Sequence, residues 1–158
     1  MATKLKQMYR HVPEDGLFGD CHRACYASIL EVPIEEIPHF FDQDRSWEES
    51  QPLFREVWDR FKIRELQIIF PEGDLDLIMQ TLENLNPGVP YILGGRSRSG
   101  VNHSVVCVGG EIFCDPSLND SGIIGPTEPD KFYWVTYLVG EIQHLSSEHQ
   151  GAKVVTHE

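Results

Sequence analysis

Apolar side chains recur at helical spacing in two stretches of the chain, residues 46–61 and 75–85. The apolar positions of the first stretch are Leu53, Phe54, Val57, Trp58 and Phe61. Ser46 and Glu49 match a capping box, a pair that commonly begins a helix. The apolar positions of the second stretch are Leu75, Ile78, Met79, Leu82 and Leu85. Asp74 is a typical N-cap residue before them, so both patterns predict amphipathic helices.

A third helix, made largely of small side chains, is predicted for residues 21–31. Small residues such as Ala24 and Ala27 let a helix approach its neighbours closely. Val32-Pro33 ends this helix, because the residue before a proline avoids the helical conformation. Residues 1–18 are polar and rich in turn-forming residues, and we expect them to form an extended lead-in.

Shorter runs of β-branched and aromatic residues predict strands at 66–70, 89–93, 104–109, 111–114 and 132–139. Gly109 and Gly110, between the third and fourth runs, predict a tight hairpin. Helices mostly precede strands without a βαβ alternation, which indicates an α+β fold with a mostly antiparallel sheet. The length of 158 residues predicts a single domain over 1–145 and a loosely ordered polar tail over 146–158.

The charge balance narrows the range of partners. Thirteen basic and twenty-five acidic side chains give a formal net charge of −12, whereas nucleic-acid binding needs clustered Lys and Arg. No apolar run approaches the roughly 18 residues that cross a membrane. Residues 1–16 also lack the apolar core of a signal peptide. We therefore expect a cytoplasmic protein that binds neither nucleic acid nor a membrane.

Cys21 and His103 are placed as nucleophilic chemistry would require. Cys21 begins the small-residue helix, where the helix dipole favours an anion by roughly 0.3–1 kcal/mol. A cysteine attacks carbonyl groups as a thiolate, and a neighbouring imidazole assists its ionisation. His103 opens one predicted strand and Asp115 directly follows the next. The hairpin between these strands would bring the imidazole and the carboxylate together.

The segments around these residues, DCHRACYASIL, HSVVCVGG and CDPS, resemble motifs of the papain-like cysteine peptidase superfamily. The nearest branch is that of the bacteriocin-exporter peptidases, which cleave after double-glycine leaders, together with related small phage and bacterial proteins. The resemblance implies a papain-like fold, with the cysteine-bearing helix packed on a mostly antiparallel sheet. It also implies a triad in which Cys21 is the nucleophile, His103 the general base and acid, and Asp115 the residue that orients the imidazole.

By this resemblance the chain is a cysteine-dependent hydrolase or acyl transferase that acts on an amide, peptide or ester bond. The peptidase branch carries a glutamine shortly before the cysteine, as a donor to the oxyanion. Gln7 is the only glutamine upstream of Cys21 in this chain. We therefore expect Gln7 and the backbone N–H of Cys21 to donate to the oxyanion. No cofactor and no metal ion are expected.

The segment GGRSRSG, residues 94–100, directly precedes the proposed base. Two arginines in a glycine-serine loop are conspicuous in an acidic protein. One interpretation is a mobile lid whose Arg96 and Arg98 hold an acidic group of a peptide or protein substrate. Asn102 is a further candidate for binding substrate or orienting His103. The other interpretation is a flexible surface turn.

These features also have interpretations without catalysis. Cysteines are common in protein cores, and disulfides are rare in cytosolic chains, so Cys25, Cys107 and Cys114 are expected to be buried thiols. A zinc site formed by the four cysteines is a less favoured alternative, because structural zinc sites use tighter spacings. His22 and His39 have no evident partner. The rival function is a catalytically inactive papain-like protein that binds a partner, such as a phage-encoded protein directed at a host factor.

Overall fold

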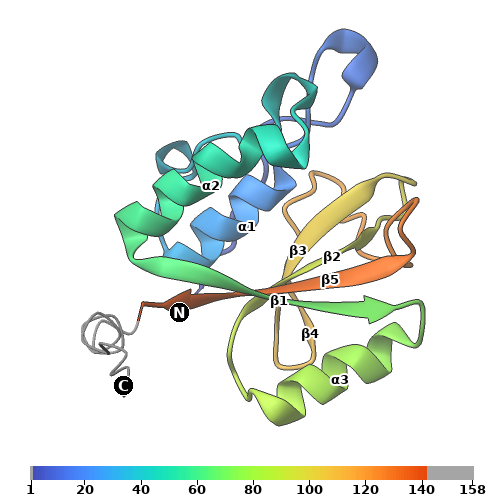
Figure 1. Ribbon diagram of the computed structural model, residues 1–158. Coiled ribbons are helices and arrows are strands. Elements are labelled where there is room, and N and C mark those ends of the chain that lie inside the picture. Colours follow the sequence, from blue (N-terminus) through green and yellow to red (C-terminus); the bar gives the residue numbers. More distant parts are fainter. Residues whose placement is uncertain (1, 142–158) are drawn as a thin grey trace, which may run out of the picture.

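The computed structural model describes residues 2–141, which form three α-helices and one five-stranded sheet (Figure 1). The helices are α1 (Cys21–Leu30), α2 (Trp47–Phe61) and α3 (Leu75–Leu85). The strands are β1 (Ile63–Pro71), β2 (Tyr91–Arg96), β3 (Asn102–Val108), β4 (Glu111–Cys114) and β5 (Phe132–Gly140). All their pairings are antiparallel, so the predicted α+β class is confirmed. The tail predicted for residues 146–158 lies outside the described residues.

The sheet has the strand order β1-β5-β2-β3-β4, so β5, the last of the described strands, lies inside it. β5 pairs with the whole of β1, from Ile63 opposite Gly140 to Pro71 opposite Phe132. Its other edge pairs with β2. The sheet is therefore complete only when β5 has inserted between two strands that precede it.

Local sequence signals set the ends of several elements as predicted. Ser46 and Glu49 form the capping box: the Ser46 hydroxyl accepts from the Glu49 backbone N–H at 3.2 Å, and the Glu49 carboxylate accepts from the Ser46 N–H at 2.8 Å. Asp74 caps α3 by accepting a backbone N–H of its first turn at 3.2 Å. Gly109 and Gly110 join β3 to β4 with φ of 68° and 73°, as a tight hairpin requires.

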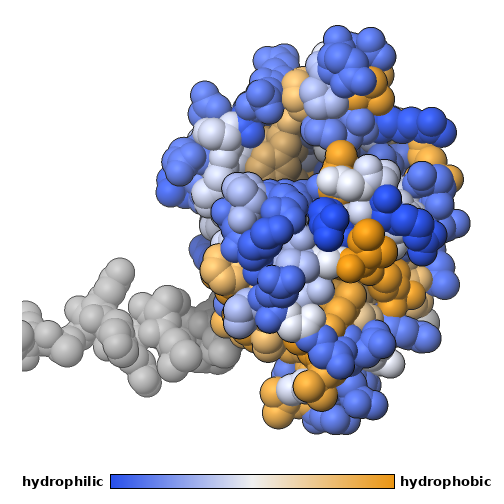
Figure 2. Space-filling model, turned by 90° about the vertical axis from the view of Figure 1, so that its right-hand side faces the viewer, coloured by the Kyte–Doolittle hydropathy of each residue, from blue (hydrophilic) through white to orange (hydrophobic). Residues whose placement is uncertain are grey.

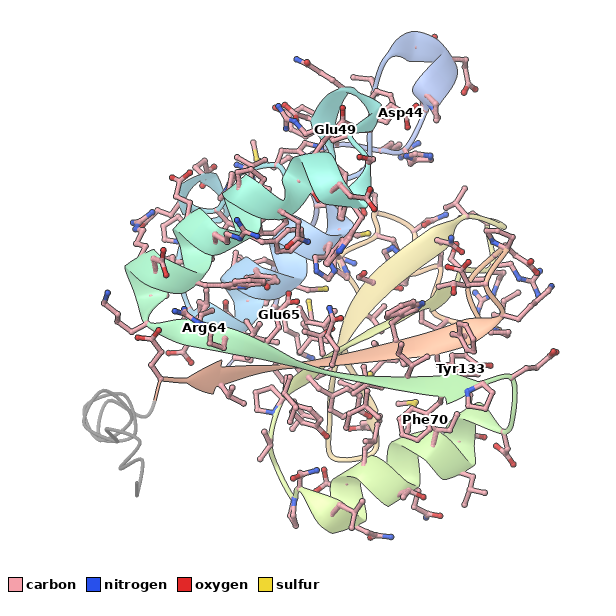
Figure 3. The ribbon with its side chains drawn as sticks, viewed as in Figure 1. Asp44, Glu49, Arg64, Glu65, Phe70 and Tyr133 are labelled. Atoms are coloured by element: carbon pink, nitrogen blue, oxygen red, sulfur yellow. The ribbon has the colours of Figure 1, made fainter. Side chains whose placement is uncertain are left out.

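Helices cover both faces of the sheet: α1 and α2 lie on one face, and α3 lies on the other (Figure 1). In Figure 3, Glu65 lies on the side of α1 and α2, whereas Phe70 and Tyr133 lie on the side of α3. The α3 face buries Met79, Leu82, Tyr91, Leu93, Val105, Cys107, Ile123, Tyr133, Val135 and Tyr137. The α1–α2 face buries Ala24, Cys25, Tyr26, Ala27, Ile34, Ile37, Phe40, Phe54, Val57, Ile63, Ile92, Val106 and Cys114.

β2 extends further than the sequence indicated. It runs to Arg96, so the loop predicted for residues 94–100 is wrong for its first three positions. Gly95 stands in this strand because of a close approach: a Cβ there would lie 2.5 Å from Cγ2 of Ile123 and 2.7 Å from the carbonyl oxygen of Gly125. A glycine inside a strand often marks such a site. The glycines that suggested a loop are thus part of the sheet.

The face shown in Figure 2 is mainly hydrophilic, with hydrophobic side chains gathered over its middle and lower part. The most exposed large apolar side chains of the described chain include Leu66, Leu77, Leu85 and Ile124. No helix within residues 2–141 has the length and the apolar character that crossing a membrane requires.

Candidate active site

Cys21 is the first residue of α1 and is partly exposed. Backbone N–H groups in the first turn of a helix have no acceptor within the helix, and the helix dipole favours an anion there. The N-cap residue Asp20 makes no capping hydrogen bond. Its buried carboxylate instead accepts from the Tyr9 backbone N–H at 2.9 Å and lies 3.4 Å from the Arg23 guanidinium. The first turn of α1 is therefore not capped by the Asp20 side chain.

Side chains from the loop after α1 and from α1 itself hold the backbone around Cys21. The Nε2 atom of His39 bonds the carbonyl oxygen of Phe18 at 2.9 Å. Arg23 donates through Nε to the carbonyl oxygen of Ile37 at 2.5 Å. His39, for which the sequence suggested no partner, thus fixes the segment that leads into the cysteine.

His103, the second residue of β3, is hydrogen-bonded to the carboxylate that follows β4. Its Nε2 lies 2.7 Å from Oδ1 of Asp115, and only 7 % of His103 is exposed. The predicted hairpin brings the two side chains together, because β3 and β4 are adjacent antiparallel strands. An imidazole held in this way has a fixed orientation and a fixed tautomer.

Asp115 is enclosed by the backbone of the loop that follows it. Oδ1 accepts from the Ser117 N–H at 2.8 Å, and Oδ2 accepts from the Gly122 N–H at 2.7 Å. Burial alone would raise the pKa of Asp115, but the hydrogen bonds from His103, Gly122 and Ser117 hold that pKa well below its usual range. Asp115 is therefore ionised throughout the physiological pH range.

Lys6 ties the N-terminal lead-in to the same loop. Its Nζ donates to the carbonyl oxygens of Asp115 at 3.0 Å and Ser117 at 2.7 Å, and to Oδ1 of Asp120 at 2.6 Å. The backbone N–H of Gln7 donates to the carbonyl oxygen of Pro116 at 2.9 Å. The lead-in thus supports the loop that holds the carboxylate.

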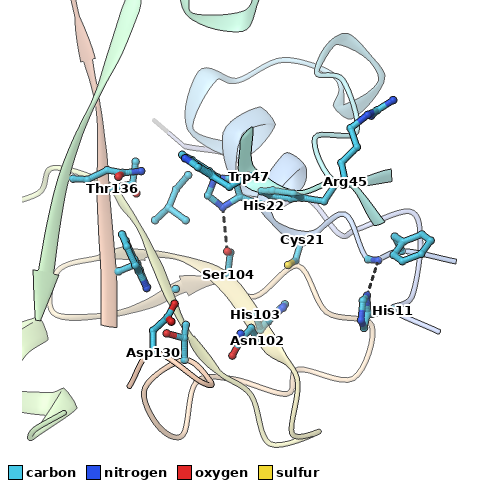
Figure 4. A pocket seen from close by; sticks show the side chains of 18 of the residues that line it. His11, Cys21, His22, Arg45, Trp47, Asn102, His103, Ser104, Asp130 and Thr136 are labelled. Atoms are coloured by element: carbon cyan, nitrogen blue, oxygen red, sulfur yellow. Dashed lines mark hydrogen bonds between the residues drawn. The ribbon is translucent and has the colours of Figure 1, made fainter. Parts of the chain in front are cut away.

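The pKa of His103 is raised from 6.5 to about 9. Burial of the ring lowers this pKa, but hydrogen bonds with Asp115 and Cys21, together with their negative charges, raise it by more. His103 is therefore an imidazolium at neutral pH. In Figure 4 the sulfur of Cys21 faces the His103 ring. The pair therefore places a group that can give and take a proton beside a partly exposed sulfur, as nucleophilic catalysis by cysteine requires.

Cys21 and His103 line a cavity of about 650 Å³ (Figure 4), a size typical of sites for small ligands. The cavity lies against α1, α2 and four of the strands. Aromatic side chains on its wall include Phe18, Phe41, Trp47 and Trp134. Polar side chains on its wall include His22, Gln67, Asn102, Ser104, Thr127 and Thr136.

His22 and Ser104 form a second link between α1 and β3, next to Cys21 and His103. Nδ1 of His22 lies 3.1 Å from the Ser104 hydroxyl (Figure 4). The imidazole is surrounded by the rings of Tyr26, Phe40, Phe41 and Phe54, at centroid distances of 5.5–6.2 Å. Burial lowers the pKa of His22 to about 4, so this ring is neutral where His103 is charged. His22, for which the sequence suggested no partner, thus has one in Ser104.

Gln7 lies on a second cavity, of about 330 Å³, which Cys21 and His103 also line. Its side-chain amide donates to the carbonyl oxygen of Tyr9 at 2.8 Å. One of the two N–H groups of this amide is thus engaged by the backbone. Gln7 and Cys21 thus line the same cavity despite their separation in the sequence.

Asn102 lines both cavities, but its side chain is bound to the backbone of another loop. Its amide donates to the carbonyl oxygen of Glu128 at 2.7 Å, and its oxygen accepts from the N–H of Glu128 at 2.9 Å. Neither Arg96 nor Arg98 lines either cavity. The Arg96 guanidinium instead lies beside Gly125, so the geometry does not support a role of these arginines in holding substrate next to Cys21.

The remaining cysteines, Cys25, Cys107 and Cys114, are buried and free. Burial raises the pKa of each of these three thiols, which keeps them unreactive relative to an exposed thiolate. Within residues 2–141 no three His, Cys, Asp or Glu side chains gather as metal ligands would. The zinc alternative therefore has no ligand set in the described part of the chain.

The sequence alone did not reveal the cavity residues Trp134 and Thr136. They enter the site because β5 pairs with β2, a long-range contact that no local pattern specifies. Trp47 is the first residue of α2, and the capping box placed it near a helix start without indicating what it faces. The sequence hinted at a role for Trp47 only by placing an aromatic residue directly after an N-cap residue.

Comparison with known proteins does not assign the chain to a family. No protein-family model matches it, and no curated protein and no solved structure matches it. What the site can do therefore follows from the residues that form it and from their geometry.

Proposed function

We propose that the protein is a cysteine-dependent hydrolase or acyl transferase with a papain-like arrangement of Cys21, His103 and Asp115. The observation that carries this proposal is geometric: at the start of α1, an imidazole held by a largely buried carboxylate faces the one cysteine in the described chain that is partly exposed. Activated cysteines occur in electropositive, partly accessible surroundings of this kind.

The first step is attack of the Cys21 thiolate on the carbonyl carbon of an amide or ester. A carbon–sulfur bond forms and the carbonyl π electrons move to oxygen. When the tetrahedral intermediate collapses, the carbon–nitrogen or carbon–oxygen bond breaks. The His103 imidazolium gives its proton to the leaving group. Asp115 holds the imidazole of His103 in place while the charge of that imidazole changes.

The second step releases the acyl group from Cys21. Neutral His103 takes a proton from water, or from another nucleophile, as that group attacks the thioester carbonyl. The carbon–sulfur bond breaks and the thiolate is restored beside the imidazolium. The backbone N–H of Cys21 and the amide of Gln7 are the donors proposed for the oxyanion in both steps.

The proposal is tested by alkylation with iodoacetamide, which reacts with thiolates. We expect one fast thiol, identified as Cys21 by peptide mass mapping, that still reacts well below pH 8. The three buried cysteines are internal controls, because their raised pKa values predict slow reaction until the chain unfolds. If all four cysteines react slowly and alike in the folded protein, the catalytic proposal is wrong and a binding protein remains.

A further inference from the structure

The residues that line the cavity beside Cys21 indicate which kind of substrate group the cavity can bind. We propose that it binds an uncharged aromatic or bulky apolar side chain of the substrate, next to the carbonyl group that Cys21 attacks. This inference rests on the proposed function, since it names the substrate class of the same site. It is carried by the walls of the cavity and by the distribution of charge around it.

Aromatic rings from separate elements line the cavity. Trp47 begins α2, Phe41 lies in the loop before it, and Trp134 lies in β5. Phe41 and Trp47 stack with their ring centroids 6.3 Å apart. Trp47 is 44 % exposed and Trp134 is half-buried, so both rings retain surface for a ligand. Rings prefer offset or edge-on contacts with other aromatic groups.

Gly94 keeps space open beside Trp134. It lies in β2 and lines the cavity. A Cβ at this position would lie 3.3 Å from the Cβ of Trp134, which is tighter than usual van der Waals contact. Any larger side chain would therefore extend into the space next to the ring, and glycine leaves that space to a bulky ligand group.

The polar groups of the wall are suited to an uncharged ligand. His22 is neutral at physiological pH, because burial lowers its pKa to about 4. Gln67, Ser104 and Thr136 add an amide and two hydroxyl groups. Such groups can orient a ligand by hydrogen bonds without attracting a charge.

The charged groups on the wall disfavour an acidic ligand. Asp44 and Asp130 are exposed at the cavity and would repel a carboxylate. Of the basic residues on the wall, Arg45 and His103 are paired with Asp42 and Asp115. His11 accepts a hydrogen bond from the Gly19 N–H through Nδ1. The acidic substrate group that the sequence suggested would have depended on Arg96 and Arg98, which line neither cavity. The charges on the wall and the space beside Trp134 therefore both favour an uncharged, bulky ligand group.

The three tryptophans allow a direct test, because two lie on the cavity and one does not. Trp58 is the internal reference: its indole donates to the Tyr26 hydroxyl at 3.0 Å and it does not line the cavity. We would titrate the Cys21→Ser protein with N-acetyl-L-phenylalanine methylamide and follow the three indole N–H signals by NMR. We expect saturable shifts of the Trp47 and Trp134 signals and none of the Trp58 signal.

Specificity is measured with N-acetyl-L-glutamate methylamide as the acidic counterpart. We expect it to bind at least about tenfold more weakly, since it forgoes the burial of an aromatic ring. Trp47→Ala should weaken binding of the phenylalanine compound about fivefold, whereas Leu77→Ala, an exposed position on α3, should leave it unchanged. Equal binding of the two compounds, or equal shifts of all three indoles, would overturn the proposal.

The titration separates this inference from the proposed function. It uses a protein without the reactive sulfur, so binding does not depend on any acyl transfer. Saturable shifts together with slow alkylation of Cys21 in the wild-type protein would retain the pocket and reject the enzyme. Fast alkylation of Cys21 without aromatic preference would retain the enzyme and reject the pocket.

Discussion

The two faces of the sheet are built from the same strands but bury different kinds of residue. On the α3 face, apolar side chains and the tyrosines of β2 and β5 pack in one cluster with Met79 and Leu82. On the α1–α2 face the apolar cluster is accompanied by partly or wholly buried polar side chains, among them His22, Tyr26 and Glu65. The large cavity opens on this face.

The polar groups of the α1–α2 face are paired with one another rather than scattered. The Tyr26 hydroxyl donates to Glu65 and accepts from the Trp58 indole. Gln67, which lines the cavity, donates to Glu65 at 2.9 Å. Burial raises the pKa values of both Tyr26 and Glu65. A buried polar group is costly unless it is hydrogen-bonded, so the α1–α2 face combines an apolar core with a hydrogen-bonded polar network next to the cavity.

Among the substitutions that test this difference between the two faces, we expect the largest effect from removing the imidazole of His103. In His103→Gln, we expect the alkylation rate of Cys21 at pH 6 to fall by about a hundredfold, because the group that assists the thiol is lost. The rate is measured with iodoacetamide and mass spectrometry. A fall of less than about threefold would show that the sulfur does not depend on its neighbour.

His103→Gln should also change how the free energy of unfolding depends on pH. The pKa of His103 in the folded protein is about 9, above its ordinary value of 6.5. Its stabilising contribution is therefore complete below pH 6.5 and is lost as the pH rises through 9. His103→Gln should reduce this alkaline decline, which urea unfolding at pH 6, 7.5 and 9 measures. The three buried thiols, whose pKa values burial also raises, should retain a decline of their own near pH 9.

A substitution on the α3 face should lower stability and leave the reactivity of Cys21 unchanged. Leu82 is 2 % exposed and belongs to the α3 cluster, so Leu82→Ala should lower the free energy of unfolding by about 2–5 kcal/mol. Alkylation of Cys21 in the folded protein should stay within about twofold of the wild-type rate, because distant sites act independently. A large fall in that rate, measured where the variant is still folded, would mean that the two faces are coupled.

His22 predicts a loss of stability on the acid side. Its pKa in the folded protein is about 4, below the ordinary value, so the unfolded chain binds the proton more readily. Stability is thus present above pH 6.5 and is lost as the pH falls through 4, by as much as about 3 kcal/mol. His22→Phe keeps an aromatic ring in this surrounding and should flatten the acid decline in urea unfolding. An unchanged acid decline would contradict the low pKa.

The smallest effect is expected at Lys6, which is half exposed. Lys6→Met removes three hydrogen bonds to the loop around Asp115 and, after allowance for solvent screening, should cost about 0.5–1 kcal/mol of unfolding free energy. Alkylation of Cys21 should slow only slightly at the same time. Lys4→Met, a neighbouring lysine without these bonds, is the matched control, and equal effects of the two substitutions would rule out the role of Lys6.

Much of the fold was predictable because its signals are local. The capping box at Ser46, the cap at Asp74 and the turn at Gly109-Gly110 depend on residues within one or two turns of each other, and all appear in the structure. The contact between His103 and Asp115 followed from the same hairpin. The local sequence specifies these pairs without any contact between distant parts of the chain.

The remainder depends on strand order, which the local pattern does not encode. Inserting β5 between β1 and β2 brings Trp134 to the cavity. The sequence pattern predicts a loop at Gly94 and Gly95, since glycine usually weakens a strand, whereas the structure places both in β2, where other segments approach closely. The partnership of His22 with Ser104 also depends on how α1 docks onto β3.

The position of β5 has a consequence for synthesis on the ribosome. Cys21 emerges early, and the strand that pairs with both β1 and β2 emerges more than a hundred residues later. Until then β1 and β2 have no shared neighbour, and the wall that Trp134 provides is missing. Such late, long-range pairing slows folding. The nascent chain therefore carries Cys21 long before the cavity beside it is complete.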